Sequence, residues 1–244
     1  SIQNGLRIAG DIFDRNIDSL NHNKGKLEAD YLFVLGKNDH KKYKKYLNGK
    51  IIEHGSLRSN LVPVSKNKFL DDQSITFISD YSYPVFGEKK IKIISEKKEI
   101  SWKRFYTCEK FIIPFLVKFC QTNGYRLNIA LRLKKNASKE ISFYNNLVKE
   151  FNFKVNFLKN YDIKTNYKRI DNSNLIVFIS STLGYEALSR GTKVFVFGVR
   201  SLAWNSKLNC FGWPFYYKKN GLFWSNEFNE KVWSNQIKKV LDLK

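Results

Sequence analysis

From Ser74 onward, short apolar runs alternate with segments of helical periodicity, and this alternation constrains the fold more than any other feature of the sequence. The apolar runs read SITFISDYS, YRLNIALRL, KVNFL, NLIVFIS and KVFVFG in chain order. Runs of this length suit strands, and apolar residues recur at helical spacing between them. Strands that alternate with helices indicate a parallel sheet covered on both faces. We therefore expect a Rossmann-like α/β domain.

The residues before this domain show the same alternation over a shorter length. ADYLFVLG (Ala29–Gly36) and KIIEHGS (Lys50–Ser56) predict two strands, and the basic segment between them predicts a helix. A stretch rich in Pro, Ser, Asn and Asp then indicates a linker. We expect the incomplete tail of an N-terminal α/β domain over residues 1–62, a linker over 63–73 and a C-terminal domain over 74–244. Since the sequence also contains no Met, we interpret the chain as a fragment.

Helix signals add detail to the second domain. Ser101–Gly124 predicts a long helix that Pro114 should kink or delay, and Ser138 is the expected N-cap of a helix that ends at Phe151. The polar run TNYKRIDNS predicts a short helix or turn, and Leu183–Arg190 predicts a helix before the last strand. NEKVWSNQIKKVLDLK predicts the terminal helix.

The net charge is the strongest compositional anomaly. The chain carries 43 Lys and Arg residues against 22 Asp and Glu residues, a formal net charge of +21. Such an excess favours anionic partners, namely nucleic acid, anionic lipid or phosphorylated substrates. The Lys-, Asn- and Ile-rich composition typical of AT-rich genomes explains part of it. No apolar stretch approaches the roughly 18 residues that a membrane-spanning helix needs.

Cysteine and histidine patterns argue against several kinds of site. Cys108, Cys120 and Cys210 are widely spaced and form no CxxC pair, so neither a disulfide framework nor a zinc site is indicated. The three histidines lack metal-ligand spacing, and no Asp-x-Asp, GxxxxGK[ST] or GxGxxG motif occurs. We therefore expect reduced cysteines, no metal and no separate cofactor.

The candidate binding site lies in SNLIVFISSTLGYEALSRGTKVFVFG. Three hydroxyl residues, Ser180, Ser181 and Thr182, stand between a strand and the next helix. Ligands of parallel sheets bind beyond the carboxyl ends of the strands, and the unpaired amides at a helix N-terminus favour an anion. Gly184 would let a phosphate approach closely. Glu186 follows Thr182 by about one helical turn, so its carboxylate can accept hydrogen bonds from two sugar hydroxyls at the same edge. The pattern predicts a pyrophosphate and ribose site.

Plainer interpretations exist for these residues. The hydroxyl groups can act as helix caps, and Glu186 can pair with Arg190 on the helix surface. Arg132 and Lys134, which follow another predicted strand, can supply positive charge to donor phosphates or can simply be solvated.

SSTLGYEALSRGTKVFVFG resembles the nucleotide-binding segment of GT-B glycosyltransferases and of the related sugar-nucleotide 2-epimerases. The shared pattern is Ser/Thr, a Gly, Glu-Ala and a Gly before a strand. The resemblance implies that Ser181, Thr182 and Gly184 contact phosphate and that Glu186 contacts ribose. SIQNGLR, LFVLGKNDHKKYKKY and EHGSLRSN are similar to segments of the N-terminal domain of bacterial surface-carbohydrate biosynthesis proteins.

Two departures from the family pattern narrow the activity. The 2-epimerases carry a Thr-Glu-Arg-Pro-Glu type run after the last strand, where this chain has VRSLAWNS, which argues against an epimerase. Transferases that use cytidine donors often show His-Pro where this chain has LRLKKN, which puts cytidine specificity in doubt.

The resemblance implies a glycosyltransferase that takes a nucleotide-sugar donor for surface polysaccharide or glycoconjugate synthesis. It also implies a glycan or lipid-linked acceptor and a cytoplasmic location, with peripheral contact at an anionic membrane face. Gly55, Ser56 and Arg58 are the acceptor-side candidates, and His54 and Arg58 are candidate catalytic residues. Since the acceptor base is expected in the missing part, the fragment should bind nucleotide without transferring sugar.

Two other functions stay open on the sequence alone. A sugar-nucleotide 2-epimerase shares the motif, and a basic nucleic-acid-binding module would account for the charge and the aromatic content. No nucleic-acid-binding motif supports the second, so nucleic acid is the less favoured partner.

Overall fold

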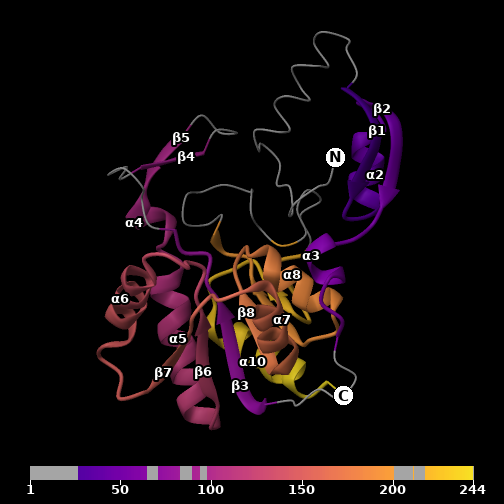
Figure 1. The fold of residues 1–244 in the computed structure, drawn as a ribbon. Coiled ribbons are helices and arrows are strands. Elements are labelled where there is room, and N and C mark those ends of the chain that lie inside the picture. Colours follow the sequence, from indigo (N-terminus) through magenta and orange to yellow (C-terminus); the bar gives the residue numbers. More distant parts are fainter. Residues whose placement is uncertain are drawn as a thin grey trace. The chain divides into compact units, whose positions relative to one another are not determined.

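The computed structural model describes residues 27–64, 71–82, 90–93, 98–200, 211 and 218–243. The chain divides into two compact units, Ser1–Pro63 with Ile93–Lys98 and Val64–Lys92 with Glu99–Lys244. Both contain parallel strands and helices (Figure 1), so the expected α/β class is confirmed. Within the ranges that the structure describes, no helix is long and apolar enough to cross a bilayer.

The first unit contains a small β–α–β arrangement. β1 (Leu27–Val34) pairs in parallel with β2 (Leu47–Glu53), and α2 (Lys37–Tyr43) connects them. Val34 and Tyr43 are buried together, which fastens the helix to the strands. The apolar end of β1 and one aromatic residue of an otherwise basic helix therefore form the local core.

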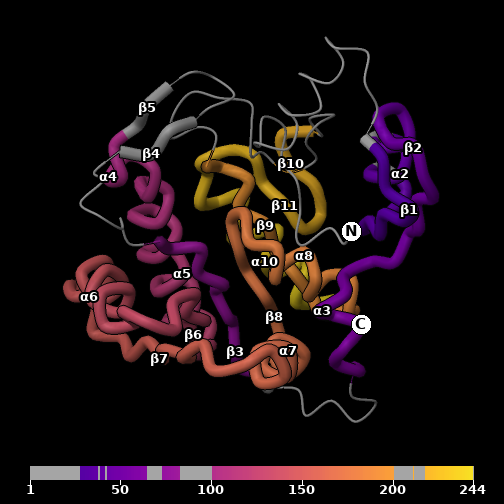
Figure 2. The backbone as a smooth tube through the Cα atoms, turned by 45° about the horizontal axis from the view of Figure 1, so that its top comes forward, coloured from indigo at the N-terminus to yellow at the C-terminus, as the bar shows by residue number. Residues whose placement is uncertain are grey.

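A seven-stranded sheet forms the centre of the second unit, in the order β10-β11-β9-β8-β3-β6-β7 (Figure 2). Its strands are β3 (Asp71–Ile78), β6 (Arg126–Ala130), β7 (Val155–Leu158), β8 (Ser173–Phe178), β9 (Val194–Phe197), β10 (Asn220–Gly221) and β11 (Trp224–Ser225). Every recorded pairing is parallel except that of β10 with β11. The chain runs from β3 out to β6 and β7, returns to β8 and continues to β9. The order therefore reverses between β3 and β8.

Helices cover both faces of this sheet. The helices of the second unit that contact it are α5 (Glu109–Asn123), α6 (Ala137–Val148), α7 (Ile163–Asn172), α8 (Thr182–Ser189) and α10 (Glu230–Leu241). The large core lies on the face of α5, α6 and α10, where alternate strand residues such as Ile75 and Phe77 pack with Trp233. α7 and α8 contact β8 from the other face, where Phe178 meets Tyr185. The expected Rossmann-like layering is confirmed.

Several predicted helix boundaries differ from the structure. The single helix expected after Ser101 is two helices, α4 (Trp102–Phe105) and α5, so the late start is observed and Pro114 lies inside α5. Asn136, in the left-handed conformation with φ 63, is the N-cap of α6 instead of Ser138. The helix therefore begins at Ala137, and Ser138 lies inside it.

The polar run TNYKRIDNS belongs to α7, a helix of ten residues that Asp162 caps by accepting from the backbone N–H of Thr165 at 2.9 Å. Its buried Tyr167 and Ile170 lie three residues apart, so one narrow apolar face is enough to fix the helix. Gly36 precedes α2. The β10–β11 hairpin and the ribbon of β4 (Lys90–Ile93) with β5 (Lys98–Ser101) carried no clear signal in the sequence.

Gly184 owes its identity to packing between α8 and β8. A Cβ atom at this position would lie 2.3 Å from ring carbons of Phe178, which is fully buried. The ring cannot move aside without disturbing the neighbouring core. Glycine therefore lets the helix approach the strand closely, as the last glycine of many nucleotide-binding folds does.

We expect Gly184→Ala to lower the free energy of unfolding by roughly 1–3 kcal/mol, because the overpacking cost exceeds the better helix propensity of Ala. Chemical denaturation measures the change. Phe178→Leu provides the control, since in the double variant the cost of Gly184→Ala should shrink if the ring causes it. Additive costs would show that the close approach to Phe178 is not the reason for the glycine.

Candidate functional site

The carboxyl ends of β3, β6, β8 and β9 lie at one edge of the sheet because these strands are parallel. The order reverses between β3 and β8, and in open α/β sheets ligands bind beyond the carboxyl ends at such a reversal. Asp80 follows β3 and Ser180 follows β8, and the Ser180 hydroxyl donates a hydrogen bond to Asp80 Oδ2 at 2.6 Å. The hydroxyl-rich segment after β8 is therefore in contact with the residue that follows β3 at this edge.

A buried arginine organises the same edge from the end of β9. Arg200 Nη2 lies 2.7 Å from Asp80 Oδ1 and 2.7 Å from Glu109 Oε1, and Nη1 donates to the backbone carbonyl of Phe105 at 2.7 Å. The guanidinium carbon lies 4.5 Å from the centre of the Phe105 ring. Arg200 and Glu109 are completely buried. Burial alone would lower the pKa of Arg200, but Asp80 and Glu109 raise it, so the arginine is charged.

Glu109 is the member of this cluster whose pKa departs most from its ordinary value toward neutral pH. Burial raises its pKa to about 7, Arg200 lowers it, and the nearby charge of Asp80 raises it further. Its Oε2 atom is buried and accepts no hydrogen bond from the described residues. Burial, which outweighs the attraction of Arg200, thus leaves the pKa of Glu109 close to neutral pH.

The start of α8 lies beside this cluster. Ser181 is the N-cap residue, but its side chain makes no capping hydrogen bond, and Thr182 is the first helical residue. The Ser180 hydroxyl is directed to Asp80 instead. Among the described contacts, side-chain capping therefore does not account for these hydroxyls.

Glu186 lies on α8 one turn after the start and is half-buried. The hydroxyl of Tyr167 on α7 donates to Glu186 Oε2 at 2.7 Å. The Arg190 guanidinium binds Asp171 through two hydrogen bonds, at 2.8 and 2.5 Å, and lies 4.8 Å from the Tyr167 ring centre, and the charge of Glu186 also helps to raise the Arg190 pKa. The Glu186 carboxylate is therefore oriented by a tyrosine.

Arg132 and Lys134 lie in the loop after β6, and both are exposed. Arg132 Nη1 donates to the backbone carbonyl of Asp80 at 2.8 Å, which brings its positive charge to the edge between β3 and β6. Within the described part of the chain, Lys134 makes no contact with the cluster.

Glu140 of α6 fixes this loop. Its carboxylate accepts hydrogen bonds from the backbone N–H groups of Arg132 and Leu133 and from the Ser79 hydroxyl, at 3.0, 2.9 and 2.5 Å. Tyr144 in turn donates to Ser79 at 2.8 Å. Burial raises the pKa of Glu140, although these hydrogen bonds oppose the rise.

The acceptor-side candidates belong to the first unit. Gly55 has φ +75, a left-handed conformation that suits glycine, and Ser56 caps α3 (Leu57–Asn60) by accepting from the Ser59 backbone N–H at 3.3 Å. Arg58 is exposed, as is His54, whose Nδ1 lies 3.5 Å from Asn60 Nδ2. The backbone conformation thus explains the glycine at position 55, and helix capping explains the serine at position 56.

Sequence reasoning missed Asp80, Glu109 and Arg200. Asp80 stands two residues after the last residue of β3 and Arg200 three residues after the last residue of β9, positions that could have marked them as edge residues. Glu109 gave no signal, because it lies in a helical segment among other charged residues. No cluster of at least three His, Cys, Asp or Glu side chains suited to a metal occurs among the described residues. Of the three cysteines, Cys108 and Cys120 are free and buried, and Cys210 lies outside the described residues.

We expect Glu109→Gln to flatten the pH dependence of the unfolding free energy. The pKa of Glu109 rises from 4.5 to about 7 on folding, so the folded state holds an extra proton between these values. Stability from this group therefore increases as the pH falls from about 7 toward 4.5 and is lost as the pH rises. The variant should remove a change on the order of 3 kcal/mol across that window.

Denaturation at several pH values measures this effect, with Glu150→Gln as the control because Glu150 is exposed. Parallel pH profiles for wild type and Glu109→Gln would show that Glu109 has an ordinary pKa.

Solved structures similar to this chain share its fold at low sequence identity. The UDP-GlcNAc 2-epimerase of Methanocaldococcus jannaschii, solved with UDP-GlcNAc and UDP, matches with TM-score 0.53 and 12% identity, over 100% of this chain and 62% of that one. The Gap123 glycosylation-associated protein complex of Streptococcus agalactiae matches with TM-score 0.51 and 11% identity, over 88% and 39%. TarM of S. aureus reaches a TM-score of only 0.46 at 14% identity, over 95% and 40%. The chain thus spans less than two thirds of these proteins.

No curated protein sequence matches the chain significantly. A family model described as "putative O-antigen biosynthesis protein" matches residues 1–243, almost the whole chain. This agrees with the expected kinship to surface-carbohydrate proteins of the GT-B type. The chain belongs to this family of O-antigen biosynthesis proteins.

Proposed function

We propose that the second unit binds a nucleotide-sugar donor at the carboxyl edge of its sheet, as part of a glycosyltransferase that builds surface glycans. The observation that carries the proposal is the meeting of Ser180 with Asp80 at the reversal of strand order, next to the start of α8. Membership of an O-antigen family and a fold shared with a UDP-GlcNAc 2-epimerase support the same chemistry.

The donor phosphates would lie at the start of α8, near Ser181 and Thr182. Backbone N–H groups at a helix N-terminus and the helix dipole favour negative charge. Asp80 would oppose an anion there, but Arg200 compensates its charge at 2.7 Å. Arg132 adds an exposed guanidinium beside Asp80, which supports its proposed role as a phosphate contact. Lys134, in the same loop, remains a proposed contact on the basis of charge alone.

The ribose would contact Glu186. A carboxylate accepts hydrogen bonds from two neighbouring hydroxyls, and Tyr167 holds this carboxylate in position by donating to Oε2. Gly184 would still allow the donor to approach the helix start, although packing against Phe178 already explains the glycine.

Catalysis in this proposal is electrostatic. The start of α8 and the basic side chains would stabilise the negative charge that develops on the leaving nucleotide. His54 and Arg58 of the first unit remain proposed catalytic residues, and Gly55, Ser56 and Arg58 remain proposed acceptor-side residues. The chain corresponds to less than two thirds of its structural relatives, so the activity and acceptor of a whole protein belong to the proposal as well.

A sugar-nucleotide 2-epimerase is the second candidate, because a 2-epimerase shares the fold over the full length of this chain. The run VRSLAWNS, in place of the expected epimerase motif, favours the transferase. Incubation of the protein with a nucleotide sugar alone separates the two, since an epimerase converts the sugar without any acceptor.

We expect Glu186→Gln to weaken nucleotide binding by about 1–3 kcal/mol, because an uncharged amide accepts hydrogen bonds from the ribose hydroxyls less strongly. The amide oxygen can still accept from Tyr167, so the fold should keep its stability. Isothermal titration with uridine, cytidine and guanosine diphosphates measures the affinity and identifies the base.

Glu230→Gln is the matched control, since it removes one exposed carboxylate from α10 on the other face of the sheet. Equal affinity in wild type and Glu186→Gln would exclude the ribose contact. Absence of binding to every nucleotide by the wild-type chain would contradict the proposed function itself.

A further inference from the structure

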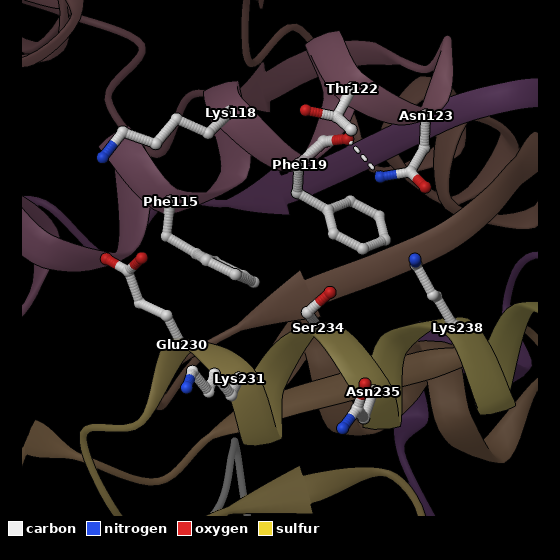
Figure 3. Close-up of a pocket in the computed structure, with 10 residues that line it drawn as sticks. All are labelled: Phe115, Lys118, Phe119, Thr122, Asn123, Glu230, Lys231, Ser234, Asn235 and Lys238. Atoms are coloured by element: carbon white, nitrogen blue, oxygen red, sulfur yellow. Dashed lines mark hydrogen bonds between the residues drawn. The ribbon is translucent and has the colours of Figure 1, made fainter.

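A shallow groove runs between α5 and α10, on the face of the sheet opposite α7 and α8 (Figure 3). Its volume is about 480 Å³. Phe115 and Phe119 of α5 point toward α10 and form the apolar floor. Its other lining residues are Lys118, Thr122, Asn123, Glu230, Lys231, Ser234, Asn235 and Lys238.

An exposed aromatic pair continues this apolar strip toward the carboxyl edge. Phe111 is 53% exposed and Phe228 is 41% exposed, and their ring centres lie 5.4 Å apart. Phe111 precedes Phe115 by one helical turn, so the two share one side of α5. Phe228 also contacts the buried Trp233, with ring centres 6.0 Å apart, which ties the pair to the core. Two large apolar rings are thus exposed to solvent, and the contact of Phe228 with the core fixes their position.

Positive charge surrounds the aromatic strip. Lys118 lies on α5, and Lys231 and Lys238 lie on α10 two turns apart; all three are exposed. Lys110 adds another exposed cation beside Phe111, and Glu230 is the one acidic residue among those that line the groove. The described face therefore combines apolar rings with an excess of cations.

We propose that this α5–α10 face docks on an anionic lipid bilayer. Phe111 and Phe228 would enter the boundary between headgroups and acyl chains, where aromatic rings are favoured. Lys118, Lys231 and Lys238 would lie against the phosphate groups. A charged rim around exposed aromatic rings is complementary to such a surface in both charge and polarity.

The aromatic pair lies near the edge of the sheet where the donor is proposed to bind. Glu109, two residues before Phe111, contacts Arg200 at the carboxyl edge, so the bilayer would lie next to the edge where the donor is proposed to bind. An acceptor carried on a lipid could then reach that edge. The inference rests on the proposed function in this respect alone, and its test requires neither donor nor acceptor.

The test is co-sedimentation of the full chain with vesicles of phosphatidylcholine alone or enriched in phosphatidylglycerol. We expect salt-sensitive binding to the enriched vesicles. The triple variant Lys118→Gln, Lys231→Gln, Lys238→Gln should bind roughly tenfold to a hundredfold more weakly, since each lysine near the surface contributes about 1 kcal/mol. Phe111→Ser with Phe228→Ser should also weaken binding.

The matched control removes the same charge from the opposite face. Lys159, Lys164 and Lys168 are exposed at and before α7, and their triple change to Gln should leave vesicle binding nearly unchanged. Leu188→Ser on α8, which removes another exposed apolar side chain, is the control for the phenylalanines. Equal loss in both lysine triples, unchanged binding by the phenylalanine variant, or equal binding to both kinds of vesicle would overturn the proposal.

Two further measurements separate this inference from its alternatives. Wild-type chain that binds random RNA but not anionic vesicles would identify the face as a nucleic-acid surface and overturn the proposal. Nucleotide titration of the same variants should show unchanged affinity. If the variants of the α5–α10 face lose vesicle binding and keep nucleotide binding, the result supports the membrane face. If the wild-type chain binds vesicles but no nucleotide, the result contradicts only the proposed function.

Discussion

The arrangement of the carboxyl edge depends on one buried guanidinium. Arg200 joins Asp80 after β3, the Phe105 carbonyl of α4 and Glu109 of α5, and through Asp80 it reaches Ser180 after β8. Buried charges are costly unless they are paired, so each of these groups needs the others. Burial raises the pKa of Glu109 to about 7, the Arg200 charge opposes this rise and the nearby Asp80 charge adds to it. The loop that receives the proposed donor is thus anchored by ionic contacts in which Arg200 and Glu109 are completely buried and Asp80 is partly buried.

Much of the fold was predictable, because strand and helix periodicities are local and the alternation from Ser74 onward survives as β3, β6, β7, β8 and β9 with the main helices between them. The hydroxyl cluster and Glu186 were also visible, since they lie within one short segment. The cluster around Arg200 was not predictable. Its partners are separated by 120 and 91 residues along the chain, and nothing local selects them from 43 basic and 22 acidic side chains. Gly184 was visible in the sequence as part of the motif. Its close approach to Phe178, however, could be seen only in the structure.

α5 connects the interior of the edge with the outer surface. Glu109 is completely buried and Phe111, two residues later, is 53% exposed, because positions two apart on a helix face in opposite directions. One turn of helix therefore carries an ionic contact inward and an aromatic ring outward. The helix therefore places the proposed docking face next to the Arg200 cluster at the proposed donor edge.

The short β10–β11 hairpin has a consequence for self-association. Without it, β9 would leave a row of unpaired backbone groups, and such an open strand is a template for pairing with another molecule. The antiparallel β10 is two residues long and ends the described sheet on that side, and β7 on the other side has four residues. Neither border of the seven-stranded sheet offers a long ladder to a second chain, so the second unit should resist intermolecular pairing through the edges of this sheet.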